Sequence, residues 1–318
     1  MKKNQAGAIL KDKNSRGKDR NWQLRKKQNM ELAKALMELG YLNFSNVYQC
    51  AEVLKFQQIE TGQLKLKQTW FCKNKLCPIC NWRRSMKYAW QTEQIVNEAI
   101  RRKPKGRYLF LTLTIKNVEG QDLEETMKGL TKAFDRLFRR AKVKKNLLGY
   151  LRSLEITLNE ETGLYHPHLH ILLFVTPTYF KGDGDNYISQ KEWSEMWQQS
   201  AKLDYLPIVD VRAVKSKKNQ LNQEIGLKKA ILETAKYPTK PINFDRENLE
   251  VIDNLAKALY RKRQIGYGGI FKDIRRELFL DDVENGDLVH ASVDEKESSE
   301  GQEIVAIWNW ERLNYFIK

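Results

Sequence analysis

Histidine, cysteine and proline are scarce in this sequence, and long apolar runs are absent. Among 318 residues there are four histidines, four cysteines and seven prolines. No hydrophobic stretch is long enough for a membrane-spanning helix, so no such span is expected. The polar start at Met1 does not lead into the hydrophobic region of a signal peptide. We therefore expect a cytoplasmic protein whose few cysteines bind metal rather than form disulfides.

Positive charge exceeds negative charge in this chain. It has 56 Lys and Arg against 40 Asp and Glu, which gives a formal net charge of +16. Such an excess favours a polyanionic partner, above all nucleic acid. Hydrophobic residues make up 41% of the sequence, enough to build one large domain or two modest ones.

Three of the four histidines fall in one short segment, Tyr165–Val175. Pro167 limits its beginning to a strand start or edge, and the apolar run that follows is too short for a helix and predicts a strand. Because side chains alternate along a strand, His168 and His170 point to one face. They form two arms of a metal site, although an isolated pair also fits two polar residues on a solvated sheet face.

A carboxylate is expected beside the two histidines. The strand predicted over Gly149–Leu158 is followed by a short glycine-containing turn and then the histidine strand, which predicts a β-hairpin. Centring the turn between Glu161 and Thr162 places Glu155 opposite His168, whereas a slip of one residue would move it to the other face. Two histidines and a carboxylate suit a divalent cation with open positions, and Mn²⁺ or Mg²⁺ suits phosphate chemistry better than a closed zinc site does.

The cysteines predict a second metal site. Cys77 and Cys80 form a Cys-x2-Cys pair, Cys72 precedes them closely, and Cys50 is favoured as the fourth ligand because no histidine lies nearby. Such a set indicates a structural Zn²⁺ site with four thiolates, the alternative being four buried free cysteines. The basic residues around it are expected to contact DNA: Lys73, Lys75, Arg83, Arg84 and Lys87.

The order of predicted elements favours an α+β fold. A strand over Leu109–Ile115 alternates apolar residues with Phe110, Thr112 and Thr114, and we expect it beside the histidine strand. Apolar stripes of helical spacing surround it. We therefore expect an antiparallel sheet with helices packed on one face, together with a small zinc-stapled lobe. The glycine-rich stretch Gly266–Gly269 is interpreted as a loop.

Three motifs occur in an order that is typical of a known superfamily. His168–His170, followed by the apolar strand, resembles the histidine-hydrophobe-histidine motif of HUH endonucleases. Upstream, Phe110–Thr114 resembles the first motif of that superfamily's replication initiators, and downstream Glu233–Lys240 resembles the third, a tyrosine with a lysine three residues on. The chain is similar to plasmid rolling-circle replication initiators with one tyrosine and a nearby glutamate. The resemblance extends from Cys50 to Tyr267.

This resemblance implies the HUH fold and the nicking of one strand at the double-strand origin of a plasmid. Tyr237 would attack the phosphodiester, leaving a 5′-phosphotyrosine link and a free 3′-hydroxyl primer. Lys240, with Lys236, would stabilise the phenolate or bind flanking phosphates. The implied partners are plasmid origin DNA, single-stranded or cruciform at the nick site, and a host helicase.

Glu233 lies four residues before Tyr237 on a helix predicted over Leu221–Lys236, so the two side chains are expected to share a face. A carboxylate there can deprotonate a water molecule. We therefore expect Glu233 to be the general base that ends replication by hydrolysis. Pro238 disfavours helical geometry at the tyrosine that precedes it.

Two other functions stay open. An HUH relaxase or transposase would share this chemistry, and a non-enzymatic zinc-containing DNA-binding protein would use the histidines structurally. The predicted divisions are a basic arm and helix over residues 1–45, a cysteine lobe over 46–100, a nickase domain over 105–280, and an acidic linker with a C-terminal segment over 281–318.

Overall fold

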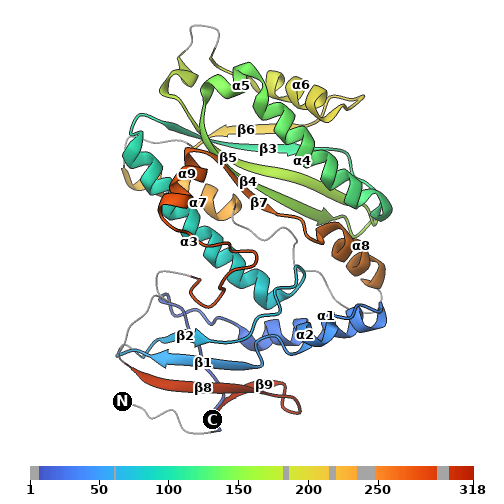
Figure 1. Cartoon of the computed structure of the whole chain (residues 1–318), viewed down its shortest axis with the longest axis vertical. Helices are drawn as coiled ribbons and strands as arrows, with labels where there is room; N and C mark the ends of the chain where they lie inside the picture. The colour runs from blue at the N-terminus through green and yellow to red at the C-terminus, as the bar shows by residue number, and fades with distance from the viewer. Residues whose placement is uncertain (1–6, 61, 182–185, 215–219, 235–247, 292–300) are drawn as a thin grey trace. The chain divides into compact units, whose positions relative to one another are not determined.

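A computed structural model describes residues 7–60, 62–181, 186–214, 220–234, 248–291 and 301–318 (Figure 1). The chain divides into two compact units. The first comprises Met1–Trp90, Pro241–Ala256 and Asp281–Lys318, and the second comprises Gln91–Lys240 and Lys257–Leu280. None of the described helices combines the length and the apolarity that crossing a membrane requires.

The second unit is built on a five-stranded antiparallel sheet of order β6-β3-β5-β4-β7. Its two longest strands are neighbours inside the sheet and carry the predicted metal residues. In chain order the strands are β3 (Arg107–Thr114), β4 (Leu147–Leu158), β5 (Tyr165–Val175), β6 (Val209–Ala213) and β7 (Ile265–Gly269).

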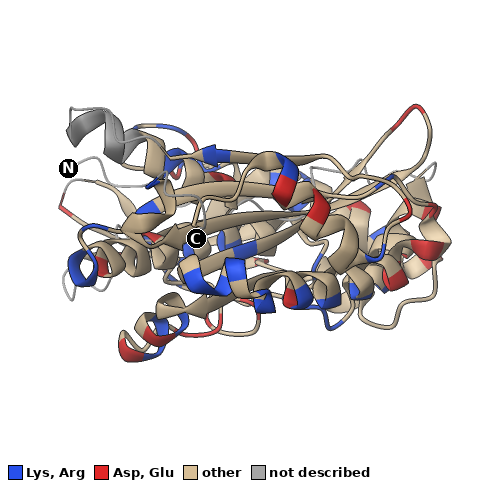
Figure 2. Ribbon diagram, turned by 90° about the horizontal axis from the view of Figure 1, so that it is seen from above, with Lys and Arg blue, Asp and Glu red and all other residues tan. Residues whose placement is uncertain are grey.

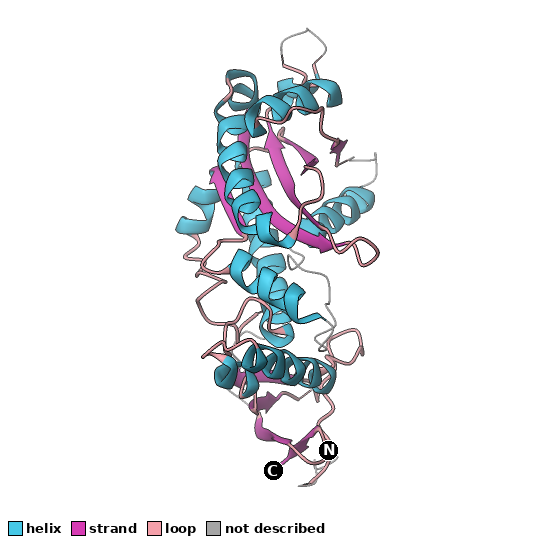
Figure 3. Ribbon diagram, turned by 90° about the vertical axis from the view of Figure 1, so that its right-hand side faces the viewer, coloured by secondary structure: helices cyan, strands magenta, loops and turns pink. Residues whose placement is uncertain are grey.

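Helices cover both faces of this sheet. On one face α4 (Leu123–Arg139) sets the ring of Phe134 5.1 Å from that of Tyr150, measured between centroids. On the other face α9 (Ile270–Glu277) places Phe271 6.0 Å from Phe174. The expectation of helices on a single face is therefore wrong, although the α+β class is confirmed (Figure 3). The remaining helices of this unit are α5 (Ala141–Asn146), α6 (Gln190–Ala201), α7 (Gln220–Thr234) and two 3-10 turns, Gly120–Asp122 and Pro177–Phe180.

The alternation predicted for β3 is confirmed. Leu109, Leu111 and Leu113 are at most 2% exposed, while Thr112 and Thr114 are half-buried on the other face. β3 pairs with β5, so that Thr112 lies opposite the second histidine of the motif and Thr114 opposite the first. The hydroxyl-bearing face of β3 therefore borders the predicted metal site.

The stretch Gly266–Gly269 is not a loop but part of the edge strand β7, which pairs with β4. A Cβ on Gly268 would lie 2.1 Å from the ring of Tyr150, and Gly269 has a φ of +57°. Glycine is needed there because the neighbouring strand approaches closely and the backbone turns left-handed. A glycine strand carries no alternating side-chain pattern, which is why the sequence indicated a loop.

The first unit contains a four-stranded sheet of order β2-β1-β8-β9. Its buried face holds Phe56, against which Trp22 of α1 packs edge-on at 6.2 Å. Residues of the N-terminal arm add to the far edge, where Leu10 donates its N–H to the carbonyl of Tyr315. The bounds are α1 (Trp22–Glu38), α2 (Phe44–Tyr48), β1 (Val53–Gln58), β2 (Leu64–Gln68), β8 (Gln302–Asn309) and β9 (Asn314–Ile317).

Two helices run from one unit into the other, α3 (Pro78–Arg102) and α8 (Leu249–Leu259). The residues that follow the second unit, 281–291, belong to the first unit and are packed there. Val283, Leu288 and Ala291 are at most 1% exposed and Glu284 is 4% exposed. The description of this stretch as a linker therefore does not fit residues 281–291.

Candidate metal centres

Glu155, His168 and His170 converge on one face of the hairpin, as the sequence predicted. Glu155 is paired with His168 across β4 and β5. The Glu155 Oε2 atom lies 3.4 Å from His168 Nε2 and 2.9 Å from His170 Nε2, and the two Nε2 atoms are 3.1 Å apart. These three residues, called the triad below, have side chains that are 9–13% exposed.

Contacts behind the triad fix the orientation of both imidazoles. His168 donates its Nδ1–H to the carbonyl oxygen of His166 at 3.0 Å. With Nε2 of His170 turned to the triad, its Nδ1–H donates to Thr112 Oγ1 at 3.1 Å. The ring of Phe110 stacks on His170 with centroids 5.5 Å apart. Nε2 is therefore the nitrogen that each histidine turns toward the other members of the triad, and a metal bound there would replace its hydrogen bond to Glu155.

The triad fits a divalent cation in its chemistry and its spacing. Burial disfavours ionisation of Glu155, but hydrogen bonds from His168 and His170 outweigh it and hold the pKa of Glu155 at about 2. The carboxylate is therefore charged. Metal–ligand bonds of ~2.1 Å at right angles separate neighbouring ligand atoms by ~3 Å, close to the distances found here. Two imidazoles and one carboxylate would occupy three coordination positions on one side of the cation and leave the others open for substrate oxygens.

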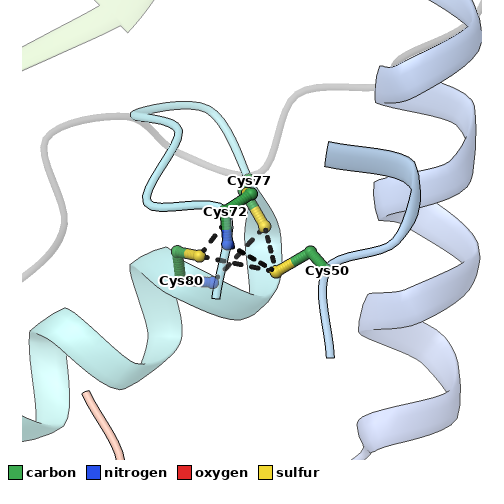
Figure 4. Close-up of side chains that lie close together, drawn as sticks. All are labelled: Cys50, Cys72, Cys77 and Cys80. Carbon is green, nitrogen blue, oxygen red and sulfur yellow. Dashed lines mark hydrogen bonds between the residues drawn. The ribbon is translucent and has the colours of Figure 1, made fainter. Parts of the chain in front are cut away.

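The four cysteines also converge (Figure 4). The Sγ atom of Cys50 lies 3.6 Å from that of Cys80 and 3.7 Å from that of Cys77, and Cys72 is 3.7 Å from Cys80. None of them forms a disulfide. Four thiolates bound tetrahedrally at ~2.3 Å have sulfur atoms ~3.8 Å apart, so this cluster fits one zinc ion.

Backbone contacts hold the cysteine cluster in place. The N–H of Cys72 donates to Cys50 Sγ at 3.4 Å, and that of Cys80 donates to Cys77 Sγ at 3.5 Å. The fully buried Lys26 donates from Nζ to the carbonyl of Cys50 at 2.8 Å. The cluster therefore ties α1, the loop before β1 and the start of α3 together.

Basic side chains around the cysteines bind residues 281–289 of the same unit. Arg83, Arg84 and Lys87 are at most 3% exposed. The contacts are Lys73 with the Asn285 carbonyl, Lys75 with the Glu284 carboxylate, Arg83 with the Leu288 and Val289 carbonyls, Arg84 with the Glu284 carbonyl, and Lys87 with the Asp281 carboxylate and the Asp287 carbonyl. The expectation that these residues contact DNA therefore does not fit the buried ones, Arg83, Arg84 and Lys87.

Glu233 lies near the end of α7, which packs on β4 and β5. The following residue, Thr234, is buried and donates its hydroxyl to the carbonyl of Ala230 at 3.0 Å. The predicted nucleophile Tyr237 and the predicted Lys240 lie outside the described residues. Their roles stay predictions.

The structure adds polar residues that the sequence did not single out. Asn117 Oδ1 accepts a hydrogen bond from His166 Nδ1 at 2.8 Å, and the backbone N–H of Lys116 donates to Tyr205 Oη at 2.7 Å. Both lie just beyond β3, and their distance in sequence from their partners hides the contacts. Lys and Arg are spread over many helices and strands among Asp and Glu (Figure 2), so the positive charge alone does not locate a DNA site.

Comparisons with known proteins connect these features to a family. Residues 63–316 match the Rep_1 model, described as a replication protein. A "Protein rep" of Streptococcus pneumoniae serotype 2 (strain D39 / NCTC 7466) is 59% identical over 98% of this chain and 96% of its own length. A second "Protein rep", from Lactiplantibacillus plantarum, is 49% identical over 97% of this chain and 99% of its own length. A "Replication protein" of Staphylococcus aureus is 44% identical over 73% of this chain and 100% of its own length. No solved structure matches the chain.

Proposed function

The chain belongs to the Rep_1 family of replication proteins, and from this membership we propose that it nicks one strand of a plasmid origin to start rolling-circle replication. The observation that carries the proposal is the triad. Ligand atoms of Glu155, His168 and His170 lie 2.9–3.4 Å apart on one face of the sheet. A divalent ion bound there, Mn²⁺ or Mg²⁺, would polarise the scissile phosphate and offset its charge.

Tyr237 is the proposed nucleophile. Its hydroxyl oxygen forms a bond to the phosphorus while the bond from phosphorus to the 3′ oxygen breaks. The phenol proton is released, and the 3′ oxygen takes up a proton. The products are a 5′-phosphotyrosine link and a 3′-hydroxyl that primes synthesis. An ordinary phenol has a pKa of ~10, so Lys240, with Lys236, is proposed to stabilise the phenolate or to bind adjoining phosphates.

Glu233 is proposed to end the cycle. The helix α7 packs on the two strands that carry the triad, which supports a place for Glu233 near the reacting phosphate. A carboxylate can deprotonate a water molecule. Hydrolysis at the regenerated origin would then release a unit-length circle without a second tyrosine.

The cysteine cluster is proposed to bind structural zinc and to support origin recognition. In this proposal the cysteine lobe comprises residues 46–100, and the nickase domain, with the HUH fold, comprises residues 105–280. The proposed partners are origin DNA, single-stranded or cruciform at the nick site, and a host helicase in the cytoplasm.

A nicking assay tests the proposal. The full chain is incubated with a supercoiled plasmid that carries its own origin, with Mn²⁺ present. We expect relaxed circles with protein covalently attached, and mass spectrometry should find the nucleotide on Tyr237. The variant Tyr237→Phe removes only the hydroxyl, so it should keep DNA binding and form no adduct. A nucleotide found on another residue, such as Tyr150 or Tyr187, would contradict the assignment.

The same assay separates the alternatives. A relaxase or transposase would also form an adduct, but it would cleave a transfer origin or transposon end rather than this plasmid's replication origin. A non-enzymatic zinc-containing DNA-binding protein would bind the plasmid and leave it supercoiled at every Mn²⁺ concentration.

A further inference from the structure

Two large apolar side chains are exposed in the loop that joins α6 to β6. Leu206 is 56% exposed and Ile208 is 79% exposed. The loop is anchored between them and after them, because Pro207 is buried and Gln190 Nε2 donates to the carbonyl of Val209 at 2.8 Å. Exposed apolar side chains mark a binding site where they lie beside other groups that can contact the same ligand.

The register of the sheet places Ile208 on the triad's face. Thr114 is paired with His168, and its Oγ1 donates to the carbonyl of Ile208 at 2.7 Å. Val209 and its partner Leu113 are buried on the opposite face, so alternation turns Ile208 to the face that carries the histidines. Two strand spacings, ~10 Å in all, separate it from His168.

An aromatic ring and a cation lie beside these two apolar side chains. Residues 203–208 together with Lys116 are called the rim below. Lys116 Nζ lies 4.2 Å from the centroid of the Tyr205 ring, and the backbone N–H of Lys116 donates to the Tyr205 hydroxyl. Nearby Arg212 is paired with Asp210 at 2.8 Å. The negative charges of Asp204 and Asp210 balance the positive charges of Lys116 and Arg212. The rim is therefore apolar and aromatic rather than strongly positive.

Resting on the nicking function proposed above, we propose that residues 203–208 and Lys116 bind the bases of the unpaired nucleotides beside the scissile phosphate. A single strand presents the faces of its bases. An aromatic side chain such as Tyr205 stacks on those faces with little sequence preference, and apolar side chains beside it gain from being covered. A duplex keeps the same faces stacked inside. The rim and the triad lie on one face of the sheet, so a strand whose phosphate reaches the triad has a path over the rim.

The test compares variants for binding of a short fluorescein-labelled single strand of mixed sequence, measured by anisotropy in EDTA. The double variant Leu206→Ser Ile208→Ser should bind about tenfold more weakly, since it removes the apolar area that the bases would cover on these two side chains. The slope of affinity against salt should not change, because no phosphate contact is removed. Leu42→Ser, at a leucine that is 95% exposed elsewhere, is the matched control and should bind as the parent does.

A second measurement does not depend on the fold of a variant. The parent protein is photo-crosslinked to the same strand carrying 5-iododeoxyuridine, and the crosslinked peptide should contain Tyr205. A crosslink confined to other peptides would overturn the inference, as would unchanged binding by the double variant. Glu155→Gln separates this result from the nicking proposal, because it should abolish nicking and leave strand binding intact. If the parent nicks its origin while the double variant binds normally, the nicking proposal stands and the rim proposal fails.

Discussion

Thr112 Oγ1 lies 3.1 Å from Nδ1 of His170, so a residue of β3 orients a member of the triad on β5. The two residues are directly paired across the strands. Phe110, two residues earlier on the same face of β3, stacks on the same imidazole. The motif Phe110–Thr114 therefore has a physical role, because two of its side chains hold the imidazole of His170 in position.

Replacing Thr112 with Val should weaken metal binding while leaving the fold intact. Valine keeps the shape and removes the acceptor for the His170 Nδ1–H, and contacts of this kind typically contribute 10- to 100-fold, by order of magnitude, to metal affinity. Isothermal titration of the purified variant with Mn²⁺ measures the change. Thr114→Val is the control, because that hydroxyl donates to the Ile208 carbonyl instead; equal losses in both variants would argue against a specific role for Thr112.

Removing either histidine of the triad should abolish Mn²⁺-dependent nicking without abolishing DNA binding. His168→Ala and His170→Ala each delete an Nε2 ligand atom, whereas His166 bonds Asn117 and its replacement should cost less. Gel assays for nicking and for origin binding, run on the same preparations, check this. Parental nicking by the double variant His168→Ala His170→Ala would refute the triad as the catalytic metal site.

The cysteine cluster should hold one zinc ion per chain. Replacing Cys77 and Cys80 with Ser should unfold the lobe and weaken origin binding, since structural zinc supplies ~10 kcal/mol or more of apparent binding free energy to small domains. Elemental analysis of protein purified without chelator measures the stoichiometry, and circular dichroism follows the unfolding. A zinc-free protein with an intact lobe would show that the four thiols are simply buried.

Glu233→Ala should separate initiation from termination. The variant still nicks and forms the adduct through Tyr237, but multimeric strands accumulate because no carboxylate activates water at the regenerated origin. Replication products of the plasmid are resolved on denaturing gels. If Glu233 only pairs with a neighbouring lysine, an interaction worth ~0.5 kcal/mol or less, unit-length circles appear at the parental yield.

Two neighbouring glycines of β7 should differ sharply in their tolerance of a side chain. A Cβ on Gly268 would lie 2.1 Å from the Tyr150 ring, whereas on Gly266 its nearest contact is 3.3 Å, with the flexible side chain of Arg152. Overpacking costs ~1–3 kcal/mol, so Gly268→Ala should lower the free energy of unfolding by about that amount and Gly266→Ala by much less. Urea denaturation of both variants gives the comparison, and equal values would mean that β4 and β7 can separate locally.

The triad was predictable because the information is local. A hairpin turn fixes the pairing of its two strands, so the position of Glu155 opposite His168 followed from counting residues on either side of the turn, and the structure confirms it. The cysteine cluster was predictable for a similar reason, since three of its members lie within nine residues, Cys72–Cys80. The resemblance to plasmid rolling-circle replication initiators is confirmed by the family match.

What the sequence did not reveal depends on contacts between distant segments. Arg83 and Lys87 were expected at a DNA surface, but their partners lie about 200 residues further along, in the stretch 281–289. No periodicity marks such a contact. The position of β7 was hidden for a different reason, because a glycine strand shows no side-chain alternation.

The pairing of β1 with β8 has a consequence for synthesis on the ribosome. Val53–Gln58 pair with Gln302–Ile307, so β1 has no partner on that side until residues 302–307 have been made. At ~5–20 residues per second, β1 waits ~10–50 seconds for β8, and the residues of the second unit are made in that interval. If the cysteine lobe binds the origin as proposed, chains that have not yet reached β8 would lack a complete first unit with which to bind the plasmid.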